Sequence, residues 1–422
     1  MSGLRHGPIG RRALIAGAAA AAFCSPLGAR AQRLEAEVVH WWTAGSESDA
    51  IRSLRRRFEA GGPAWIDTPV QGPDLAKTAA LTRILGGRPP AVMLWHVGPD
   101  LPQLVRDGVI RDIDAVAVAE GWDALLPKTI SDRLKVDGKY VAAPVDLHGA
   151  NWTFANLKLL KAAGIGVPET WPQVIEACQA LKSSGVIPIA FSGQPWQEAL
   201  VFIQVIAGTG GANLIRRFTT DHDPTAAESP EMVASFEMFA RLKPFVDKAS
   251  PNRNYTDTAS LVSTDRAALY FSGDWSRGEL NKAGMRNGLD YACRLAPGND
   301  GIFLAVVDAF CMPRSVPKAL APLQDAFARL TMSLEAQHEF NLLKGSIPLR
   351  PDVDLNGYDA CSQLAARLTR GGGEVLASAS LGMTTAMRGA FYDVIHRFWF
   401  ADDANPKVAA RDLRIAIERN RA

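Results

Sequence analysis

The sequence lacks most of the features that mark metal-binding proteins and enzymes. Only five of its 422 residues are cysteines, and their wide spacing fits none of the paired patterns that bind zinc. The segments G-x-S-x-G, H-E-x-x-H and a Walker loop are absent, and no strand is followed by G-x-G-x-x-G. The common signatures of hydrolases, zinc peptidases and nucleotide-binding enzymes are therefore missing. We expect no metal, no cofactor and no enzymatic activity.

An excess of charge of one sign is also lacking. Lysine and arginine number 46 against 44 aspartate and glutamate, and several of the arginines fall in the first 31 residues. Nucleic acids and anionic membranes attract clustered basic charge. We expect neither of them as a partner.

Long apolar runs are scarce, and the first of them belongs to a predicted export signal over residues 1–31. Arg11 and Arg12 precede the apolar run, and "ARA" at residues 29–31 fits an A-x-A cleavage site. The run is shorter than the ~20 residues of a spanning helix, and we expect no spanning helix later in the chain. The mature protein is predicted to begin at Gln32. The paired arginines leave both the general and the twin-arginine export routes open.

The mature chain shows apolar runs alternating with stretches of helical period. Residues 37–42 and 91–96 have the composition of strands, and residues 49–62 have the period of a helix that glycines end. Asp137-Gly138 between apolar flanks predicts a tight hairpin, and Thr170 is a candidate helix cap. The alternation is typical of an α/β fold with mainly parallel sheets. With 391 residues left after cleavage, we expect two lobes rather than one core.

Tryptophans stand beside polar side chains at predicted strand ends and loops. Each instance alone has a structural interpretation, because such a tryptophan is usually core and a neighbouring aspartate usually caps a helix. A sugar, however, offers an apolar face for stacking and a rim of hydroxyl groups for hydrogen bonds. The recurrence of the pattern predicts a neutral carbohydrate ligand. The residues of these groups are Trp41, Trp42 and Glu47; Trp95 and His96; His148, Asn151 and Trp152; Gln194, Trp196 and Gln197; and Asp274 and Trp275.

Six segments in order along both halves carry a resemblance to a known family. They are "VVHWWTAGSE", "GPDLPQL", "DGKYVAAPVDLHGANW", "GQPWQEAL", "FSGDWSRGE" and "NLLKGSIPLRPDVD". The mature chain resembles the extracellular solute-binding proteins of sugar ABC transporters, in particular the bacterial glucose-binding branch. The resemblance implies a periplasmic-binding-protein-like fold of two α/β lobes with a hinge of several chain crossings. It also implies a periplasmic monomer that closes on a sugar and delivers it to the permease subunits.

The resemblance further implies which side chains bind the sugar. One of Trp41 and Trp42 would stack on the ring, and the other, pointing to the opposite face, would pack into the lobe. Asp274 has an alternative role as the cap of a helix that begins near Trp275. The full predicted set is Trp41, Trp42, Glu47, His96, His148, Asn151, Gln194, Trp196, Asp274, Trp275, Asp308 and Lys344.

Two positions depart from the glucose-binding branch. The branch tends to carry lysine where this chain has Val97 and histidine where it has Leu381. Each lost group is a hydrogen-bond partner in the relatives, and an unpaired buried hydroxyl costs ~1–3 kcal/mol. A monosaccharide remains the predicted class, and its identity is left open.

The predicted lobes are discontinuous in sequence. The first comprises residues 32–147 and 307–349, and the second comprises residues 148–306 and 350–422. Cys293 and Cys361 would then share a lobe, and we predict a disulfide between them, with buried free thiols as the alternative.

Two other functions remain open at this stage. A secreted glycoside hydrolase would use paired carboxylates such as Glu47 and Asp308. A sugar receptor that reports to a chemosensor would have the same binding residues.

Overall fold

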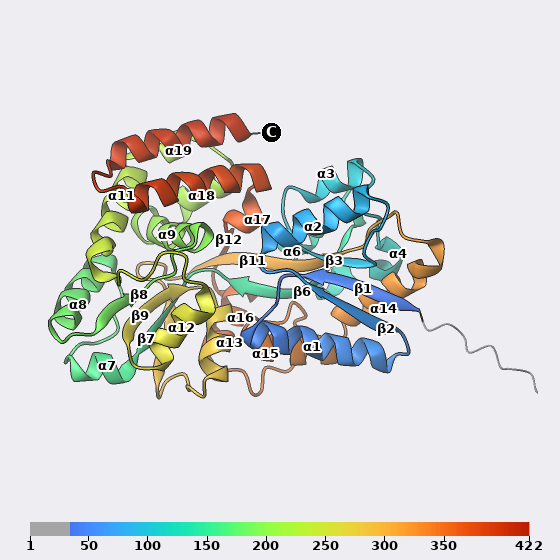
Figure 1. The fold of residues 1–422 in the computed structure, drawn as a ribbon, viewed down its shortest axis with the longest axis horizontal. Coiled ribbons are helices and arrows are strands. Elements are labelled where there is room, and N and C mark those ends of the chain that lie inside the picture. The colour runs from blue at the N-terminus through green and yellow to red at the C-terminus, as the bar shows by residue number, and fades with distance from the viewer. Residues whose placement is uncertain (1–33, 422) are drawn as a thin grey trace, which may run out of the picture. The chain divides into compact units, whose positions relative to one another are not determined.

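The computed structural model describes residues 34–421. The predicted export signal and its cleavage site lie outside the described residues. The described chain contains two larger β-sheets flanked by helices and one short hairpin (Figure 1).

The first sheet is mixed, with strand order β12-β11-β3-β1-β2 and β6 paired to β11. β1 is parallel to β2 and β3, while β11 is antiparallel to both β3 and β6. The strands are β1 (Glu35–His40), β2 (Ala64–Pro69), β3 (Val92–His96), β6 (Ala142–Gly149), β11 (Ile302–Cys311) and β12 (Glu374–Ala377).

The second sheet has the order β10-β7-β9-β8. Its strands are β7 (Trp152–Asn156), β8 (Ile187–Ala190), β9 (Ala267–Ser272) and β10 (Tyr291–Leu295). Only the β8–β9 pair is parallel among the pairs of this sheet in the described chain. The expectation of mainly parallel sheets is therefore wrong. Local alternation of strands and helices predicts crossovers, but it carries no information on how strands from distant parts of the sequence pair.

The helices that flank the first sheet come from both ends of its sequence range. Figure 1 shows α1 and α15 on one face of the sheet and α2 on the other. These helices are α1 (Gly45–Ala60), α2 (Pro73–Leu85), α3 (Leu101–Arg106), α4 (Asp114–Ala119), α5 (Trp122–Leu125), α6 (Lys128–Ser131), η1 (Asp132–Leu134), η3 (Lys318–Leu320), α14 (Ala321–Thr331) and α15 (Leu334–Lys344).

The remaining helices belong to the segments around the second sheet and to the C-terminal part. They are α7 (Leu157–Ala162), α8 (Trp171–Ser183), α9 (Pro195–Thr219), α10 (Pro224–Ala227), α11 (Pro230–Leu242), η2 (Lys243–Phe245), α12 (Tyr255–Ser263), α13 (Trp275–Lys282), α16 (Ala360–Arg367), η4 (Leu368–Gly372), α17 (Ala379–Gly382), α18 (Thr385–Phe400) and α19 (Pro406–Asn420).

Two local predictions are confirmed in detail. β4 (Lys135–Val136) and β5 (Lys139–Tyr140) form a hairpin in which Asp137 and Gly138 have φ of 51° and 76°. Both central residues of this turn need positive φ. Thr170 caps α8, since its side chain accepts from the Gln173 amide while the Gln173 side chain accepts from the Thr170 amide.

Helix α9 is, within residues 34–421, the one helix long and apolar enough to cross a membrane. It packs against α11 and α18, and its apolar side chains are mostly buried there. It is interrupted at Gly211, which has φ of 70°. These features are those of a core helix in a globular protein.

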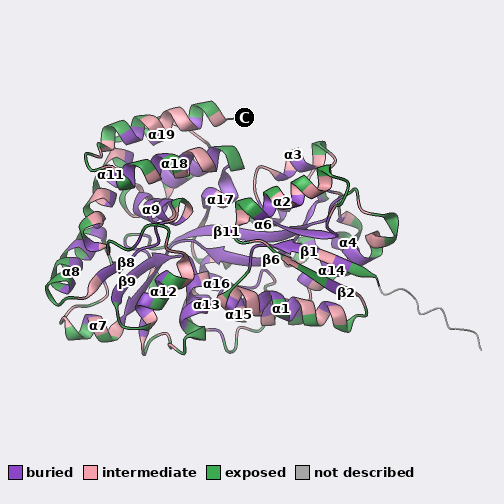
Figure 2. Cartoon of the chain, in the orientation of Figure 1, coloured by how far each residue is buried: buried purple, intermediate pink, exposed green. Residues whose placement is uncertain are grey.

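Buried aromatic side chains form the centre of each half. Phe202 lies 4.4 Å from Phe236, measured between ring centroids, beside the second sheet. Phe310 lies 4.9 Å from Phe327 beside the first sheet. Figure 2 shows β6 and β11 of the first sheet and β9 of the second as buried, whereas the edge strand β2 is partly exposed.

The chain passes between the two sheets more than once. β6 ends at Gly149 and β7 begins at Trp152, and the return runs from β10 to β11. β11 continues across residues 306 and 307, and β12 of the C-terminal segment pairs with the first sheet. These pairings place strands from both predicted lobe 2 segments in the first sheet, while the lobe boundaries themselves stay a prediction.

Cys293 of β10 and Cys361 of α16 form a disulfide with their Cα atoms 6.1 Å apart. This pairing confirms the prediction. Cys178 and Cys311 are buried free thiols.

Candidate ligand-binding site

Three neighbouring strands of the first sheet bring together two carboxylates and two histidines. In the strand register, Asp308 of β11 lies opposite His96 on β3 and Asp146 on β6. His148 follows Asp146 by two residues and therefore points to the same face. The register shifts between Asp308 and Ala309, and such bulges redirect side chains. His96 Nε2 lies 3.5 Å from Asp308 Oδ1, and His148 Nε2 lies 3.2 Å from Asp146 Oδ2.

The ends of two helices add an ion pair to this group. Lys344 is the last residue of α15, and Gly345 with φ of 88° ends the helix there. The Lys344 Nζ donates to Glu47 Oε1 at 2.6 Å and lies 3.2 Å from His148 Nε2. Glu47 stands in the first turn of α1, directly after β1. The first turn of α1 lies beside the last turn of α15, so the side chains of Glu47 and Lys344 meet.

The second half of the chain supplies Asp274 and Trp275 at the start of α13. The Asp274 carboxylate accepts from the Gly149 amide at 2.8 Å and from His148 Nδ1. It makes no side-chain cap of α13, so the alternative role as a helix cap is wrong. The Trp275 ring stands edge-on to His148, with 5.5 Å between ring centroids. His148 therefore joins the two halves.

We call the group Glu47, Asp146, His148, Asp308 and Lys344 the acidic cluster. Burial opposes the charge of His148, but Asp146 and Asp274 raise its pKa to about 10. Burial, and after it the charge of Asp146, raises the pKa of Asp308 to about 8. Burial also opposes the charge of Lys344, but Glu47, Asp146 and Asp308 together outweigh it and raise the pKa of this lysine. His148 and Lys344 thus stand as cations among the three carboxyl groups of the cluster.

Asp146, His148 and Asp308 have potential ligand atoms within 4.8 Å of one another, which is a spacing that could hold a metal ion. A histidine that binds a metal must be neutral, whereas His148 is held in its protonated form. The ammonium of Lys344 also lies beside it. Because these cations already balance the carboxylates, we interpret the cluster as a polar site for an organic ligand.

The two adjacent tryptophans point in different directions, as expected. Trp42 is 1 % exposed and packs against Phe310 and Phe340 at 5.8 and 5.1 Å. Trp41 lies instead beside His96, with 4.8 Å between the rings. Trp41 thus approaches the acidic cluster through His96, which lies 3.5 Å from Asp308. Trp42 packs in the core, with the Lys344 ammonium 5.2 Å from its ring.

Three other predicted residues lie apart from the acidic cluster or are engaged elsewhere. The Asn151 carboxamide donates to Asn299 and to the Ile302 carbonyl and accepts from the Leu304 amide. Asn151 therefore binds the segment around the start of β11, next to the crossing between β6 and β7. Gln194 accepts from the indole of Trp196 at 3.1 Å. Trp196 reaches the group through Trp275, at 6.1 Å between rings, and through Tyr255, at 6.4 Å.

Sequence reasoning missed four residues. Asp146 could have been found, because it shares a strand face with His148. Tyr255 lies beside Glu47, and burial followed by the charge of Glu47 raises the pKa of its hydroxyl well above the usual range. Lys77 is a buried lysine within α2, where no local pattern sets it apart. Glu279 is described next.

Glu279 of α13 caps α1 from the other half of the molecule. Ala44, at the N-cap position of α1, offers no side-chain cap. The Glu279 carboxylate accepts instead from the Ser46 amide at 2.7 Å and from the Ser46 hydroxyl at 2.8 Å. A side chain at Gly45 would collide with this carboxylate. The helix that carries Glu47 is thus held by a residue 233 positions away.

Asp308→Asn is expected to make stability less dependent on pH between pH 5 and 8. An aspartate has a pKa of about 3.9 in an unfolded chain, and in the folded protein Asp308 has a pKa of about 8. The folded state therefore keeps a proton that the unfolded state loses, and the wild type loses stability as pH rises, by up to about 1.4 kcal/mol per pH unit. Urea unfolding at several pH values measures this loss, with exposed Asp393→Asn as the control. Parallel profiles for wild type and Asp308→Asn would contradict it.

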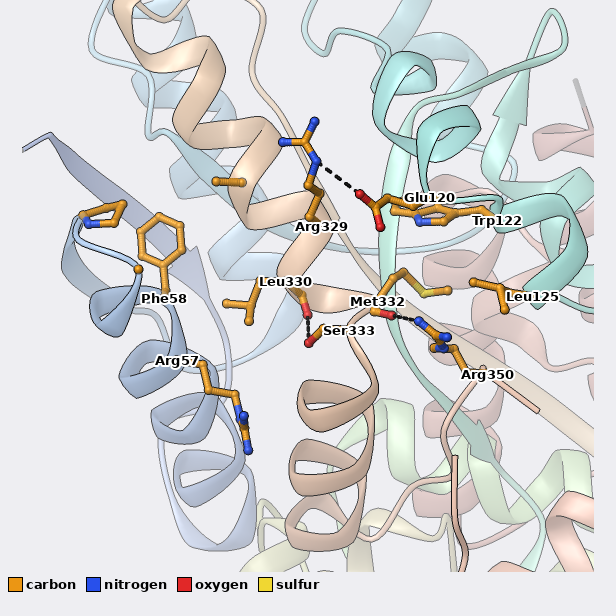
Figure 3. A pocket seen from close by; sticks show the side chains of 13 residues that line it. Arg57, Phe58, Glu120, Trp122, Leu125, Arg329, Leu330, Met332, Ser333 and Arg350 are labelled. Atoms are coloured by element: carbon orange, nitrogen blue, oxygen red, sulfur yellow. Dashed lines mark hydrogen bonds and ion pairs between the residues drawn. The ribbon is translucent and has the colours of Figure 1, made fainter. Parts of the chain in front are cut away.

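A separate cavity of about 370 Å³ opens beside α1, α5 and α14 (Figure 3). Its arginines are engaged: Arg329 pairs with Glu120, and Arg350 donates to the Met332 carbonyl. None of the predicted ligand-binding residues lines it. Its lining residues are Arg57, Phe58, Gly61, Pro63, Glu120, Trp122, Leu125, Ala326, Arg329, Leu330, Met332, Ser333 and Arg350.

Comparison with known proteins decides the family. The family model of the bacterial extracellular solute-binding proteins matches residues 44–311, a range that contains most of the acidic cluster. The chain belongs to this family. A probable sugar-binding periplasmic protein of Rhizobium meliloti (strain 1021) is 33% identical over 417 residues, covering 97% of this chain and 99% of that protein. Another, from Brucella melitensis biotype 1, is 32% identical over 413 residues, covering 96% of each. The predicted periplasmic localisation is confirmed.

Solved structures of similar fold support the same architecture. The bacterial solute receptor AcbH, described as having an exclusive preference for b-D-galactopyranose, superposes with a TM-score of 0.77 at 17% identity, covering 92% of this solute-binding protein and 98% of AcbH. Maltose-bound MalE3 of T. maritima has a TM-score of 0.75 at 14% identity, covering 92% and 99%. The predicted two-lobed α/β fold is confirmed. The glucose-binding branch stays a prediction.

Proposed function

We propose that this solute-binding protein is the periplasmic receptor of a sugar ABC transporter and that it captures a monosaccharide at the acidic cluster. One observation carries the proposal: buried polar side chains from both halves of the chain converge on His148. Asp308 and Asp146 come from the first sheet, Lys344 from α15, and Asp274 binds His148 from the second half. Closure of two lobes would bring these groups together around a ligand.

The chemistry of the cluster suits a polyhydroxyl ligand. Glu47 and Asp146 accept hydrogen bonds, Lys344 donates them, and Asp308 in its protonated form does both. The rings of Trp41 and Trp275 border the cluster and provide apolar faces for stacking. The relatives described as sugar-binding and the galactopyranose receptor AcbH support this class of ligand.

A glycoside hydrolase is the alternative enzyme. It would need one carboxyl group as acid and one as base or nucleophile on opposite sides of a bond. Glu47 is instead held in an ion pair by Lys344, and the relatives named above are binding proteins. Incubation with aryl glycosides separates the two functions, because turnover would contradict the receptor.

A transport receptor delivers its sugar to the permease, whereas a signalling receptor reports to a chemosensor. A receptor for a chemosensor would have the same site. Reconstitution with the permease subunits in vesicles tests delivery: sugar uptake supports transport, and binding without uptake favours the chemosensor.

Glu47→Gln is expected to weaken monosaccharide binding by ~1.5–3 kcal/mol, the range for a hydrogen bond to a charged group. A thermal-shift screen over monosaccharides first identifies the sugar, and calorimetry then measures both proteins. Glu335→Gln is the matched control, because Glu335 also lies in the first turn of a helix but is exposed. Equal affinities of wild type and Glu47→Gln for the sugar would contradict the assignment of Glu47 to the binding site.

A further inference from the structure

A second group of buried polar side chains lies next to the acidic cluster and contains no carboxyl group. It consists of Lys77 from α2, His96 from β3 and Arg388 from α18, which we call the basic group. The Lys77 and Arg388 side chains are each about as buried as core residues, at 4 % and 3 % exposure. Two fully buried cations from separate segments are costly unless something compensates their charge.

Lys77 has no carboxylate partner within ion-pair distance in the described part of the chain. Its Nζ lies 3.2 Å from His96 Nδ1 and 4.9 Å from the centre of the Trp95 ring. It is also 6.0 Å from the Trp41 ring, which borders the acidic cluster. The ammonium therefore contacts a neutral imidazole and aromatic faces, and it has donors left over.

Arg388 is only weakly compensated. Its Nη2 lies 3.5 Å from Asp74 Oδ1 and 3.3 Å from the Thr385 hydroxyl. Asp74 is largely exposed to solvent, and exposed pairs are weak. The nearby Asp100 carboxylate is directed to the Thr385 amide and hydroxyl.

The charges of these groups act on one another. Burial, and after it the charge of Arg388, lowers the pKa of Lys77 to about 7. Burial and then the charge of Lys77 lower the pKa of His96 well below its usual range. The neutral His96 can accept from Lys77 at Nδ1 and direct its Nε2 proton toward Asp308, 3.5 Å away. His96 thus stands between Asp308 of the acidic cluster and Lys77 of the basic group.

Among the described residues, the indole Nε1 of Trp95 is a buried donor without a hydrogen-bond partner. Its ring lies under the Lys77 ammonium. Every polar group that the basic group adds is therefore a donor or a cation. A neutral hydroxyl could satisfy one of them, but an anion satisfies several at once.

We propose that the ligand is a sugar acid whose hydroxyl groups bind the acidic cluster and whose carboxylate binds Lys77 and Arg388. This inference rests on the proposed function, since it places a monosaccharide at the same site. The carboxylate supplies the negative charge that the basic group lacks. The Trp41 ring lies beside His96 and Lys77, and His96 lies 3.5 Å from Asp308, so the sugar ring would stack on Trp41 between the two groups.

Calorimetry with D-glucuronate, D-galacturonate and D-gluconate, beside glucose, galactose and D-glucuronamide, tests the charge of the ligand. We expect at least one acid to bind about ten-fold or more tightly than its neutral counterpart, as for a charge-assisted hydrogen bond. Neutral sugars that bind as tightly as the acids would overturn the inference and leave the proposed function standing. A preference for glucose 6-phosphate over the acids would overturn the assignment of a carboxylate. Failure of every neutral and acidic sugar would contradict the proposed function itself.

Substitutions then test the position of the carboxylate. Lys77→Met and Arg388→Met are each expected to lower the affinity for the acid about ten-fold or more and to reduce the preference over the neutral counterpart. Lys77→Arg keeps the charge and is expected to retain more of this preference. Exposed Arg397→Met on the same helix as Arg388 is the matched control. Circular dichroism and melting confirm folding of each variant, and an unchanged preference in folded Lys77→Met and Arg388→Met would overturn the assignment.

Discussion

Trp42→Ala is expected to lower the free energy of unfolding by ~3–5 kcal/mol, the range for truncating a buried aromatic side chain. Trp42 is almost fully buried between Phe310 and Phe340. Neighbouring side chains cannot fill a space of this size, so the loss includes a cavity. Urea unfolding without ligand measures it.

Trp41→Ala is the matched comparison, since it removes the same side chain one residue earlier. Trp41 contacts His96 and Lys77 in addition to Trp42, and it is 9 % exposed against 1 % for Trp42. We expect it to weaken ligand binding while changing stability less than Trp42→Ala does. Equal losses of stability at both positions would contradict the assignment of Trp42 to the core and Trp41 to the site.

Removing the disulfide by Cys293→Ser and Cys361→Ser together is expected to cost about 4 kcal/mol of stability. The bond closes a loop with a sequence separation of 68 residues, and the loss of chain entropy in the unfolded state scales with the logarithm of this length. Urea unfolding under non-reducing conditions gives the difference.

Reductant provides the control for this experiment. It should lower the stability of the wild type toward that of the double variant and leave the variant unchanged. Cys178→Ala reports on the loss of a buried thiol that forms no bond. Reductant sensitivity of the double variant would show that the effect has another origin.

Local features of the fold could be predicted because neighbouring residues determine them. The Asp137-Gly138 turn needs two positive φ angles, and Thr170 needs only an amide three residues on. The direction of strand pairing could not be predicted in this way. β11 pairs with strands from residues 92–96 and 142–149, and nothing in a short window specifies which distant strand will be the neighbour or in which direction it runs.

The residues of the candidate site also fall into those that could be predicted from the sequence and those that could not. His148, Asp308 and Lys344 were predicted through the family resemblance and meet in the structure. Lys77 shows no such signal, because a lysine on a helix is usually exposed. Its burial becomes evident only when α2 packs on β3 beside Trp95.

The central place of β11 also determines the order in which the protein can fold. Asp308 binds Asp146 across 162 positions of sequence, and β11 is the strand to which β3, β6 and β12 all attach. During synthesis from the N-terminus, β1, β2 and β3 are made first. One edge of β3 then has no strand to pair with until some 200 further residues have been made. Contacts of such long range form slowly, and open strand edges aggregate in the meantime. The binding residues are thus assembled last, when the strand that carries Asp308 closes the sheet.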